Sequence, residues 1–185
     1  MLNIAFENGD IKFERPKSDA SQERNDWFSI LLVHQNKYRG MRAGVSKRNS
    51  VQEKIFPSFL NLVIWGHEHE CITEPSVNAD TGVIFLYPGS TVITSLSDYE
   101  AKPKHCFIVR IQRTKLNITP IPLERARPFI YKSVIISDYN NSNQLGIIPN
   151  LQRIVDGLLQ QYNNSLFLPL MRIKVFILLD RLHWM

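Results

Sequence analysis

The sequence lacks the features that mark secreted disulfide-rich proteins and membrane proteins. It holds only two cysteines, Cys71 and Cys106, which are too few for a disulfide framework and do not have the paired spacing of a structural zinc ribbon. No apolar run is long enough to span a bilayer, and charged residues interrupt the first stretch too early for a secretory signal. Internal repeats and low-complexity tracts are absent as well. These absences predict a soluble, intracellular globular protein with no membrane partner.

The composition is that of an ordinary globular chain with a basic excess. Of the 185 residues, 44% are hydrophobic and 21% are charged, so the chain can bury one sizeable core, or one core and part of a second. The 22 basic and 17 acidic residues give a formal net charge of +5. A basic excess favours a polyanionic partner because neutralising phosphates releases counterions, although a solvated basic surface is the simpler explanation of charge alone.

Most of the chain shows the apolar patterns of β-strands. A hairpin is expected around Asn8-Gly9, a dipeptide suited to a type I′ turn. Residues 27–33 and 62–65 (WFSILLV and LVIW) are nearly all apolar, as in strands buried on both faces. The other strands are predicted from their patterning: residues 2–6 and 11–13, which flank the Asn8-Gly9 turn, and residues 83–87, 106–111, 116–121, 129–136 and 171–175.

The sequence also predicts helices in two places. Ser50 opens the pattern S-V-Q-E, which is a capping box, and Pro57 would end or kink the short helix that follows. An amphipathic helix is expected to begin near Asn150, because apolar side chains then recur on one face at helical spacing: Leu151, Ile154, Val155, Leu158, Leu159 and Tyr162. Residues 37–49 and 137–143 are expected to connect these elements. Strands and helices together predict an α/β fold.

Histidines follow two of the predicted buried strands. Residues 27–33 lead into His34, and residues 62–65 lead into Gly66-His67-Glu68-His69. If the backbone stays extended, His67 and His69 point the same way, and Gly66 permits a close approach to an ion. Neutral imidazole is a common metal ligand, so we favour a metal site over the alternative of partly exposed histidines at strand ends.

A family resemblance becomes specific at these residues. A strand followed by His34, and then a strand followed by Gly-His-Glu-His, resembles the last two signature motifs of the calcineurin-like metallophosphoesterases. Four sequences, VHQN, LVIWGHEHE, PGSTVITSL and Lys104-His105, resemble more narrowly the eukaryotic double-strand-break repair nucleases of the meiotic-recombination (SbcD-like) family. The similarity extends from about Leu2 to about Val175.

The resemblance implies a fold and a domain boundary. We expect a partial layered metallophosphoesterase sheet of the α/β class over residues 1–123, followed by a partial α+β DNA-binding cap over residues 124–185. The chain is expected to be a truncated gene product, with unrelated sequence after Val175. In the family, an Asp-x-His, a Gly-Asp and a Gly-Asn-His motif precede the motifs matched here, and this chain is expected to begin beyond them.

The resemblance also implies a two-manganese site. By motif position, His34 and His67 serve one ion and His69 the other, while Glu68 is expected to have a structural role. The missing motifs would supply the bridging aspartate and the histidine that acts as general acid, so no catalytic residue is assigned. Two close dications repel each other unless anionic oxygen lies between them. We therefore expect the chain alone to bind manganese weakly and to be inactive.

A second set of residues is expected to contact DNA phosphates, because hydroxyl and basic groups lie in loops beside a phosphoesterase cleft. For Ser90 and Thr91 the alternative is an ordinary turn, and for the basic residues it is a solvated surface. The expected DNA-binding residues are Ser90, Thr91, Lys102, Lys104, His105 and Arg127.

Three functions are compatible with these patterns. The first is a manganese-dependent DNA endonuclease and 3′–5′ exonuclease subunit of the nuclear double-strand-break repair complex, acting also in meiosis. By resemblance, its partners would be DNA, a Rad-fifty-type coiled-coil ATPase, an Nbs/Xrs-type adaptor and a second copy of the complete protein. The second is a non-catalytic DNA- or partner-binding fragment. The third, a metallophosphoesterase with a non-DNA substrate, is disfavoured by the run PGSTVITSL and by the expected cap.

Overall fold

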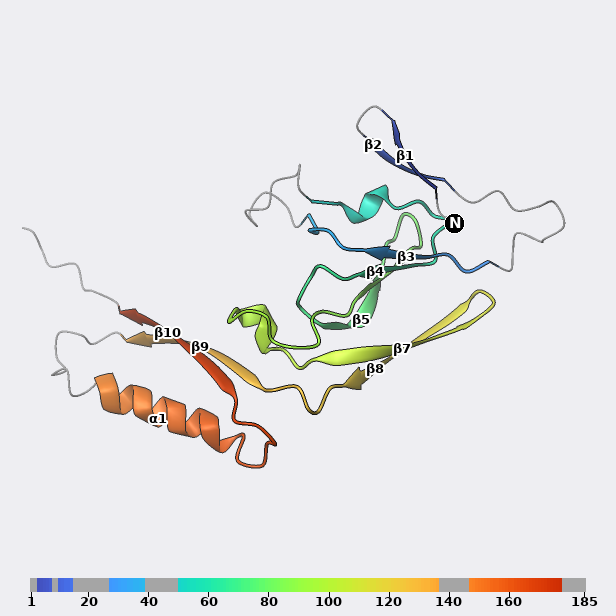
Figure 1. Ribbon diagram of the computed structural model, residues 1–185. Coiled ribbons are helices and arrows are strands. Elements are labelled where there is room, and N and C mark those ends of the chain that lie inside the picture. Colours follow the sequence, from blue (N-terminus) through green and yellow to red (C-terminus); the bar gives the residue numbers. More distant parts are fainter. Residues whose placement is uncertain (1–2, 8–9, 15–26, 39–49, 137–146, 178–185) are drawn as a thin grey trace, which may run out of the picture. The chain divides into compact units, whose positions relative to one another are not determined.

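The computed structural model describes residues 3–7, 10–14, 27–38, 50–136 and 147–177 (Figure 1). The chain divides into two compact units. The first unit comprises Met1–Thr91 and Lys104–Leu123, and the second comprises Val92–Pro103 and Glu124–Met185. The assignment of residues 1–123 to a phosphoesterase domain and of residues 124–185 to a DNA-binding cap stays a prediction.

The first unit is built on a four-stranded sheet with the order β3-β4-β6-β5. The strands β3 (Ile30–Val33), β4 (Leu62–Trp65) and β6 (Ile84–Tyr87) run parallel, and β5 (Ile72–Val77) pairs antiparallel with β6 at the edge. Parallel strands are usually covered on both faces, which explains the continuous apolar runs LVIW and IFLY. This sheet confirms the expected mixed α/β class.

One face of this sheet carries an aromatic-rich core. Trp65 and Phe85 are fully buried, and Tyr87 is 3% exposed. The ring of Phe56 meets Trp65 edge-on at 5.7 Å, while Tyr87 stacks on Trp65 at 5.9 Å between ring centroids. Each such pair stabilises the fold by about 0.5–1.5 kcal/mol beyond area burial. The core therefore fixes the last residues of β4 and β6, which lead directly into polar loops.

Two hairpins accompany the sheet in the first unit. Strands β1 (Asn3–Glu7) and β2 (Asp10–Glu14) pair antiparallel, as predicted, although the Asn8-Gly9 turn itself lies outside the described residues. Strands β7 (His105–Gln112) and β8 (Lys115–Pro122) form a longer hairpin in continuous register. Arg113 takes a positive φ of 54° in its turn.

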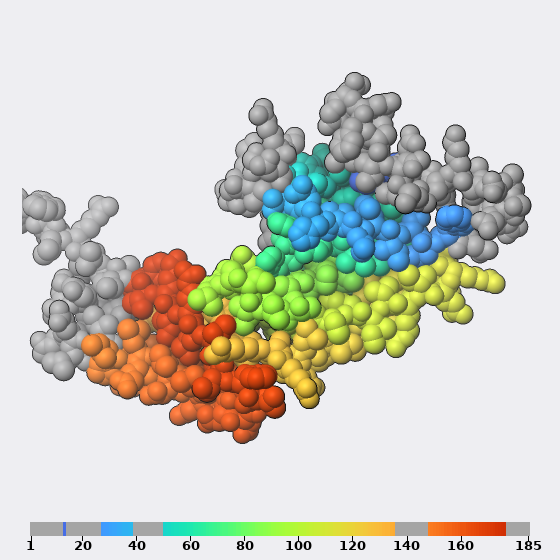
Figure 2. All heavy atoms as spheres, viewed as in Figure 1, coloured from blue at the N-terminus to red at the C-terminus, as the bar shows by residue number. Residues whose placement is uncertain are grey.

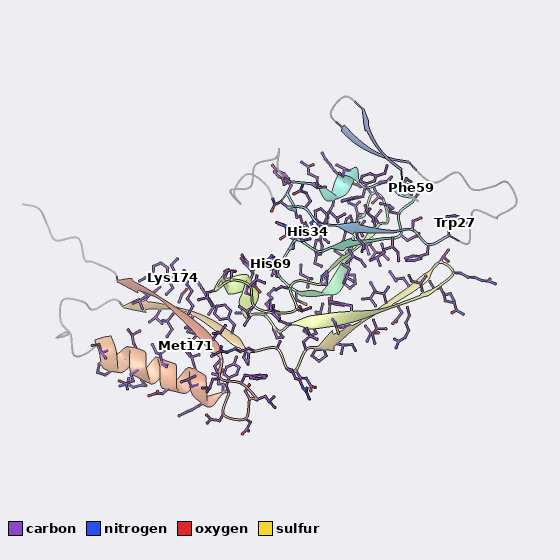
Figure 3. All side chains as sticks on the ribbon, in the orientation of Figure 1. Trp27, His34, Phe59, His69, Met171 and Lys174 are labelled. Carbon is purple, nitrogen blue, oxygen red and sulfur yellow. The ribbon has the colours of Figure 1, made fainter. Side chains whose placement is uncertain are left out.

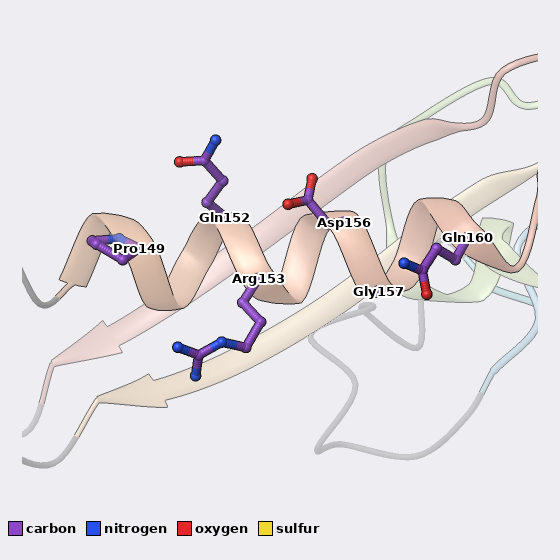
Figure 4. A pocket seen from close by; sticks show the side chains of 6 residues that line it. All are labelled: Pro149, Gln152, Arg153, Asp156, Gly157 and Gln160. Carbon is purple, nitrogen blue, oxygen red and sulfur yellow. The ribbon is translucent and has the colours of Figure 1, made fainter.

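The second unit contains a strand–helix–strand arrangement. Strands β9 (Phe129–Ile136) and β10 (Leu170–Ile177) pair in parallel, and α1 (Ile147–Gln160) lies between them in sequence. A shallow groove of about 410 Å³ runs along α1, lined by Pro149, Gln152, Arg153, Asp156, Gly157 and Gln160 (Figure 4). Among the helices that the structure describes, none combines the length and apolar character needed to cross a membrane.

Some predicted elements differ in the structure. The helix expected after Ser50 is wrong: Val51 forms a β-bridge with Lys37, and only the 3-10 helix η4 (Glu53–Ile55) follows. Of residues 27–33, only the last four form strand β3, and the expected burial on both faces is wrong, because Ile30 and Leu32 are exposed. Strand β5 was not predicted, because Pro75 and polar neighbours interrupt its apolar pattern.

Candidate functional site

The three parallel strands β3, β4 and β6 are each followed by a polar loop at the same side of the sheet, where their carboxyl ends lie. Strands β3 and β4 end in register, with Val33 opposite Trp65, and the Gly66 amide donates to the Val33 carbonyl at 2.8 Å. His34 therefore lies beside the Gly66-His67-Glu68-His69 loop, and the loop Pro88–Ser90 follows β6 at the same edge. The carboxyl ends of parallel strands are the usual place for binding and catalytic residues.

The three candidate metal ligands are neighbours at this edge. The rings of His34 and His67 lie 5.0 Å apart between centroids, and those of His67 and His69 lie 6.5 Å apart. His34 is exposed, and His67 and His69 are half-buried. His34 and His69 are labelled in Figure 3. The sequence thus predicted correctly that these histidines lie together, whereas their role as ligands stays a prediction.

The described residues do not by themselves fit a two-manganese site. Within the ranges that the structure describes, no group of three or more histidine, cysteine, aspartate or glutamate side chains is placed to hold a metal ion. The nearby carboxylate of Glu68 instead accepts a hydrogen bond from the Lys37 backbone amide at 3.0 Å, which agrees with its expected structural role. Three neutral imidazoles supply no charge to offset two dications.

One expectation about the missing motifs needs correction. A Gly-Asp dipeptide does occur, at Gly9-Asp10. However, Asp10 begins strand β2, which belongs to the two-stranded β1-β2 sheet and not to the sheet that carries His34 and His67. Asp10 therefore lacks the position at the end of a parallel strand that the two histidine motifs share.

Lys37 holds the segment that follows His34 in place, and no sequence pattern indicates this role. Its ammonium forms an ion pair with Glu53 at 2.5 Å and lies 4.3 Å from the centroid of the Tyr87 ring. The Tyr87 hydroxyl donates to the same Glu53 carboxylate. Burial alone would raise the pKa of Glu53, but the hydrogen bonds from Lys37 and Tyr87 and the charge of Lys37 outweigh it and lower that pKa.

Hydrogen bonds to backbone groups hold the same segment on both sides. The indole N–H of Trp65 donates to the Gln35 carbonyl. The Val51 amide donates to the Asn36 carbonyl at 2.8 Å, and the Tyr38 amide donates to the Val51 carbonyl at 2.9 Å. Residues 35–38 are thus hydrogen-bonded to β4 and to the residues before η4. These bonds restrict the position of His34, which directly precedes residue 35.

The loop after β6 is fastened to the histidine loop through Ser90. The Ser90 amide donates to the His69 carbonyl at 3.1 Å, and its hydroxyl lies 3.4 Å from the same oxygen. Lys104, only 5% exposed, donates from Nζ to the Ser90 hydroxyl at 2.9 Å. Lys104 was expected to face DNA phosphates, but its side chain is buried and donates to Ser90.

Gly89 permits this close approach of the two loops. Its φ is +70°, and a Cβ added to it would lie 2.6 Å from the Cys71 amide nitrogen and 2.8 Å from the His69 carbonyl oxygen. Gly66, by contrast, does not have a positive φ, and a Cβ there would make only ordinary contacts, at 3.6 Å from His34. The sequence suggested Gly66 as the special glycine, but the structural requirement falls on Gly89.

The other expected DNA-binding residues have different surroundings. Thr91 is exposed in the first unit, and Lys102 is exposed in the second. The His105 ring nitrogen Nδ1 lies 3.6 Å from Cys71 Sγ. In the second unit, the exposed Arg127 donates from Nε to the Leu168 carbonyl at 2.8 Å. The contact of any of these residues with DNA stays a prediction.

Known proteins resemble the chain over most of its length. No protein-family model matches it. It is 34% identical over 174 residues to the double-strand break repair protein MRE11 of Arabidopsis thaliana, a match that covers 89% of this chain and 24% of that protein. It is 36% identical over 169 residues to mus-23 of Neurospora crassa, covering 88% and 22%, and 37% identical over 134 residues to human MRE11, covering 72% and 18%.

The chain is MRE11-like. This similarity confirms the resemblance drawn from LVIWGHEHE and PGSTVITSL. The chain spans about a quarter or less of the length of these relatives. An MRE11-like sequence of this extent is consistent with a partial metallophosphoesterase-like domain.

In this MRE11-like chain, sequence reasoning missed the residues that hold the histidine loops in place. Lys37 and Glu53 are 16 positions apart, and Glu53 and Tyr87 are 34 apart, so only the tertiary fold brings them together. Gly89 lies in the motif PGSTVITSL, but a Gly in a loop is compatible with many turns. Its positive φ is visible only in the structure.

Proposed function

We propose that the chain supplies part of the nuclease domain of an MRE11-type double-strand-break repair protein. The observation that carries this proposal is the arrangement of His34, His67 and His69 at the carboxyl ends of two neighbouring parallel strands. The similarity to MRE11 of Arabidopsis thaliana and of human supports it. Phosphodiester hydrolysis, with endonuclease and 3′–5′ exonuclease modes, is the reaction class that this assignment implies.

We further propose that the three histidines contribute to a manganese site that needs carboxylates from outside the described residues. Manganese would supply a Lewis acid and an activated water when bound. The protein's own part is then to hold the imidazoles in place, through the Ser90 contacts to the His69 carbonyl and the Lys37 contacts after His34. Because the described residues offer no bridging carboxylate, we expect the chain alone to bind manganese weakly and not to cleave DNA.

A nuclease assay paired with a binding measurement tests both points. The purified chain is incubated with single-stranded and duplex DNA in manganese buffer, beside an intact MRE11-type nuclease as a positive control. Manganese binding is followed by electron paramagnetic resonance for the chain and for His67→Ala. We expect no cleavage above background, and weak binding that His67→Ala weakens further. Cleavage that depends on His67 would overturn the predicted inactivity, and binding unaffected by His67→Ala would remove the metal assignment.

A non-catalytic role is the second candidate, and the lack of a complete ligand group among the described residues favours it for the chain by itself. In this role the first unit, with the β9–α1–β10 segment as part of a DNA-binding cap, would engage DNA or a protein partner. The partners that the family suggests are a Rad-fifty-type ATPase, an Nbs/Xrs-type adaptor and a second MRE11-type chain, in the nucleus. Co-purification of the tagged chain with each purified partner separates this role from simple inactivity.

A further inference from the structure

Two stretches of the sequence, residues 27–52 and residues 101–123, carry basic residues and no acidic ones. The whole sequence has 22 basic and 17 acidic residues. Residues 101–123 contain five basic residues and no acidic one, so the rest of the chain carries 17 of each sign. Residues 101–123 form the β7–β8 hairpin and the segment just before it, and the structure describes all of them. A local excess of basic charge produces a positive field at the surface that carries it.

The hairpin presents much of this charge on one exposed face. Alternate residues of a strand share a face, and the register places Arg110 opposite Asn117 and Gln112 opposite Lys115. All four side chains are exposed, as is Arg113 in the turn. In Figure 2 the hairpin, drawn in yellow and yellow-green, lies at the visible surface. Lys104, at the other end of the hairpin, is buried and does not contribute to this face.

Hydrogen bonds order the polar side chains of this face. An Arg110 guanidinium nitrogen donates to the Thr119 hydroxyl at 3.4 Å, and that hydroxyl donates to the Asn117 side-chain oxygen at 3.1 Å. The half of the face nearer the turn holds no apolar side chain, whereas Ile108 and Ile121 lie at its other end. We call the residues Arg110, Gln112, Arg113, Lys115 and Asn117 the basic tip.

We propose that the basic tip binds the sugar–phosphate backbone of duplex DNA. This inference rests on the proposed DNA-repair function and assigns a contact surface to it. Arginine, lysine, asparagine and glutamine are the side chains that supply phosphate contacts in protein–DNA interfaces. The central part of a protein–protein interface is instead apolar and poor in lysine. The composition of the basic tip therefore favours a nucleic acid over an acidic protein.

The test measures how the affinity of the full chain for DNA depends on salt. Fluorescence anisotropy on a labelled duplex is recorded from low to moderate salt for the chain and for the triple variant Arg110→Gln, Arg113→Gln, Lys115→Gln. A control removes an exposed charge elsewhere in the first unit, outside the proposed DNA-binding cap, by Lys54→Gln. Each phosphate contact contributes about 0.9 to the log–log slope, so the tip variant should lose up to about 2.7 of slope and the control far less.

The outcomes separate a failure of DNA binding by the basic tip from a failure of the proposed DNA-repair function. If the tip variant and the control bind DNA with equal salt slopes, the basic tip is not a DNA-binding surface, and the DNA-repair proposal is unaffected. Absence of binding by the unmodified chain at low salt overturns both. Displacement of the duplex by an equal charge concentration of poly-glutamate assigns the tip to an acidic protein and overturns the DNA proposal for this surface. Circular dichroism of all three proteins shows whether the substitutions change the fold.

Discussion

The ammonium of the buried Lys104 donates a hydrogen bond to the Ser90 hydroxyl across 2.9 Å. An ammonium group can only donate, so the Ser90 oxygen must accept and its own proton is available for the His69 carbonyl 3.4 Å away. The start of strand β7 is thereby connected through Ser90 to the loop that contains His67 and His69.

The first prediction is that Lys104 and Ser90 are energetically coupled. Ser90→Ala should lower the free energy of unfolding by about 1–3 kcal/mol, because it removes a hydrogen-bond partner of a buried charged group. In a Lys104→Met background the same substitution should cost less, since the ammonium is no longer present. Urea unfolding of the four proteins in the cycle measures this coupling, which for contacting residues is about 0.5–3 kcal/mol.

Two controls make that cycle decisive. Ser90→Thr keeps the hydroxyl and should retain most of the stability. Lys102→Met removes a basic group that is exposed, and it should change the unfolding free energy by less than about 0.5 kcal/mol. An equal cost of Ser90→Ala with Lys104 and with Met at position 104 would show that the two side chains act independently.

The contrast between Lys104 and His34 shows what the sequence could predict. A histidine after a continuous apolar run has a position fixed by local pattern, because the end of a parallel strand lies at a known edge of the sheet. The location of His34, His67 and His69 was predictable for this reason. The sequence shows the charge of Lys104 but not its burial, so a buried hydrogen-bonding residue was expected on the surface.

The same distinction explains the error at Ser50. The pattern S-V-Q-E satisfies a local helix-capping rule, but Val51 pairs with Lys37 and its neighbours are held by strand-like hydrogen bonds. A tertiary interaction therefore overrides the local propensity. The ion pair of Lys37 with Glu53 fixes the residues that follow. No pattern within the segment itself indicates a partner that lies 16 positions away.

The second prediction concerns Gly89. Gly89→Ala should be strongly destabilising, by more than about 3 kcal/mol, because the new Cβ would meet backbone atoms of Cys71 and His69 at 2.6–2.8 Å and the positive φ adds strain. Backbone atoms cannot move aside as a flexible side chain would. Thermal and urea unfolding measure the loss.

Gly82→Ala is the matched control for this substitution. Gly82 has a φ of +71°, which is close to the value at Gly89, but nothing lies within 4 Å of a Cβ placed there. It should therefore cost only the strain of the left-handed backbone, about 1–2 kcal/mol. A similar loss for both variants would mean that φ alone, and not the contact between the two loops, makes glycine necessary at position 89.

The last prediction is a pH dependence of stability that comes from Glu53. Its pKa in the folded protein lies below the ordinary value of 4.5, because Lys37 and Tyr87 favour the carboxylate more than partial burial disfavours it. A carboxyl group with a lowered folded pKa stabilises the protein above its unfolded pKa, and this contribution is lost as the pH falls through the folded value. The contribution of Glu53 to the unfolding free energy should thus be constant near neutral pH and decline below about pH 4.5.

Glu53→Gln should flatten that decline and cost of the order of 1 kcal/mol or less near pH 7, since the ion pair is partly solvated. Tyr87→Phe, which keeps the ring under Lys37 and removes one hydrogen bond, should flatten it in part. Glu124→Gln, at an exposed position, serves as the control and should leave the profile unchanged. Urea unfolding from pH 3 to pH 8 measures all four proteins, and a decline as steep in Glu53→Gln as in the unmodified chain would assign the acid sensitivity to other carboxylates.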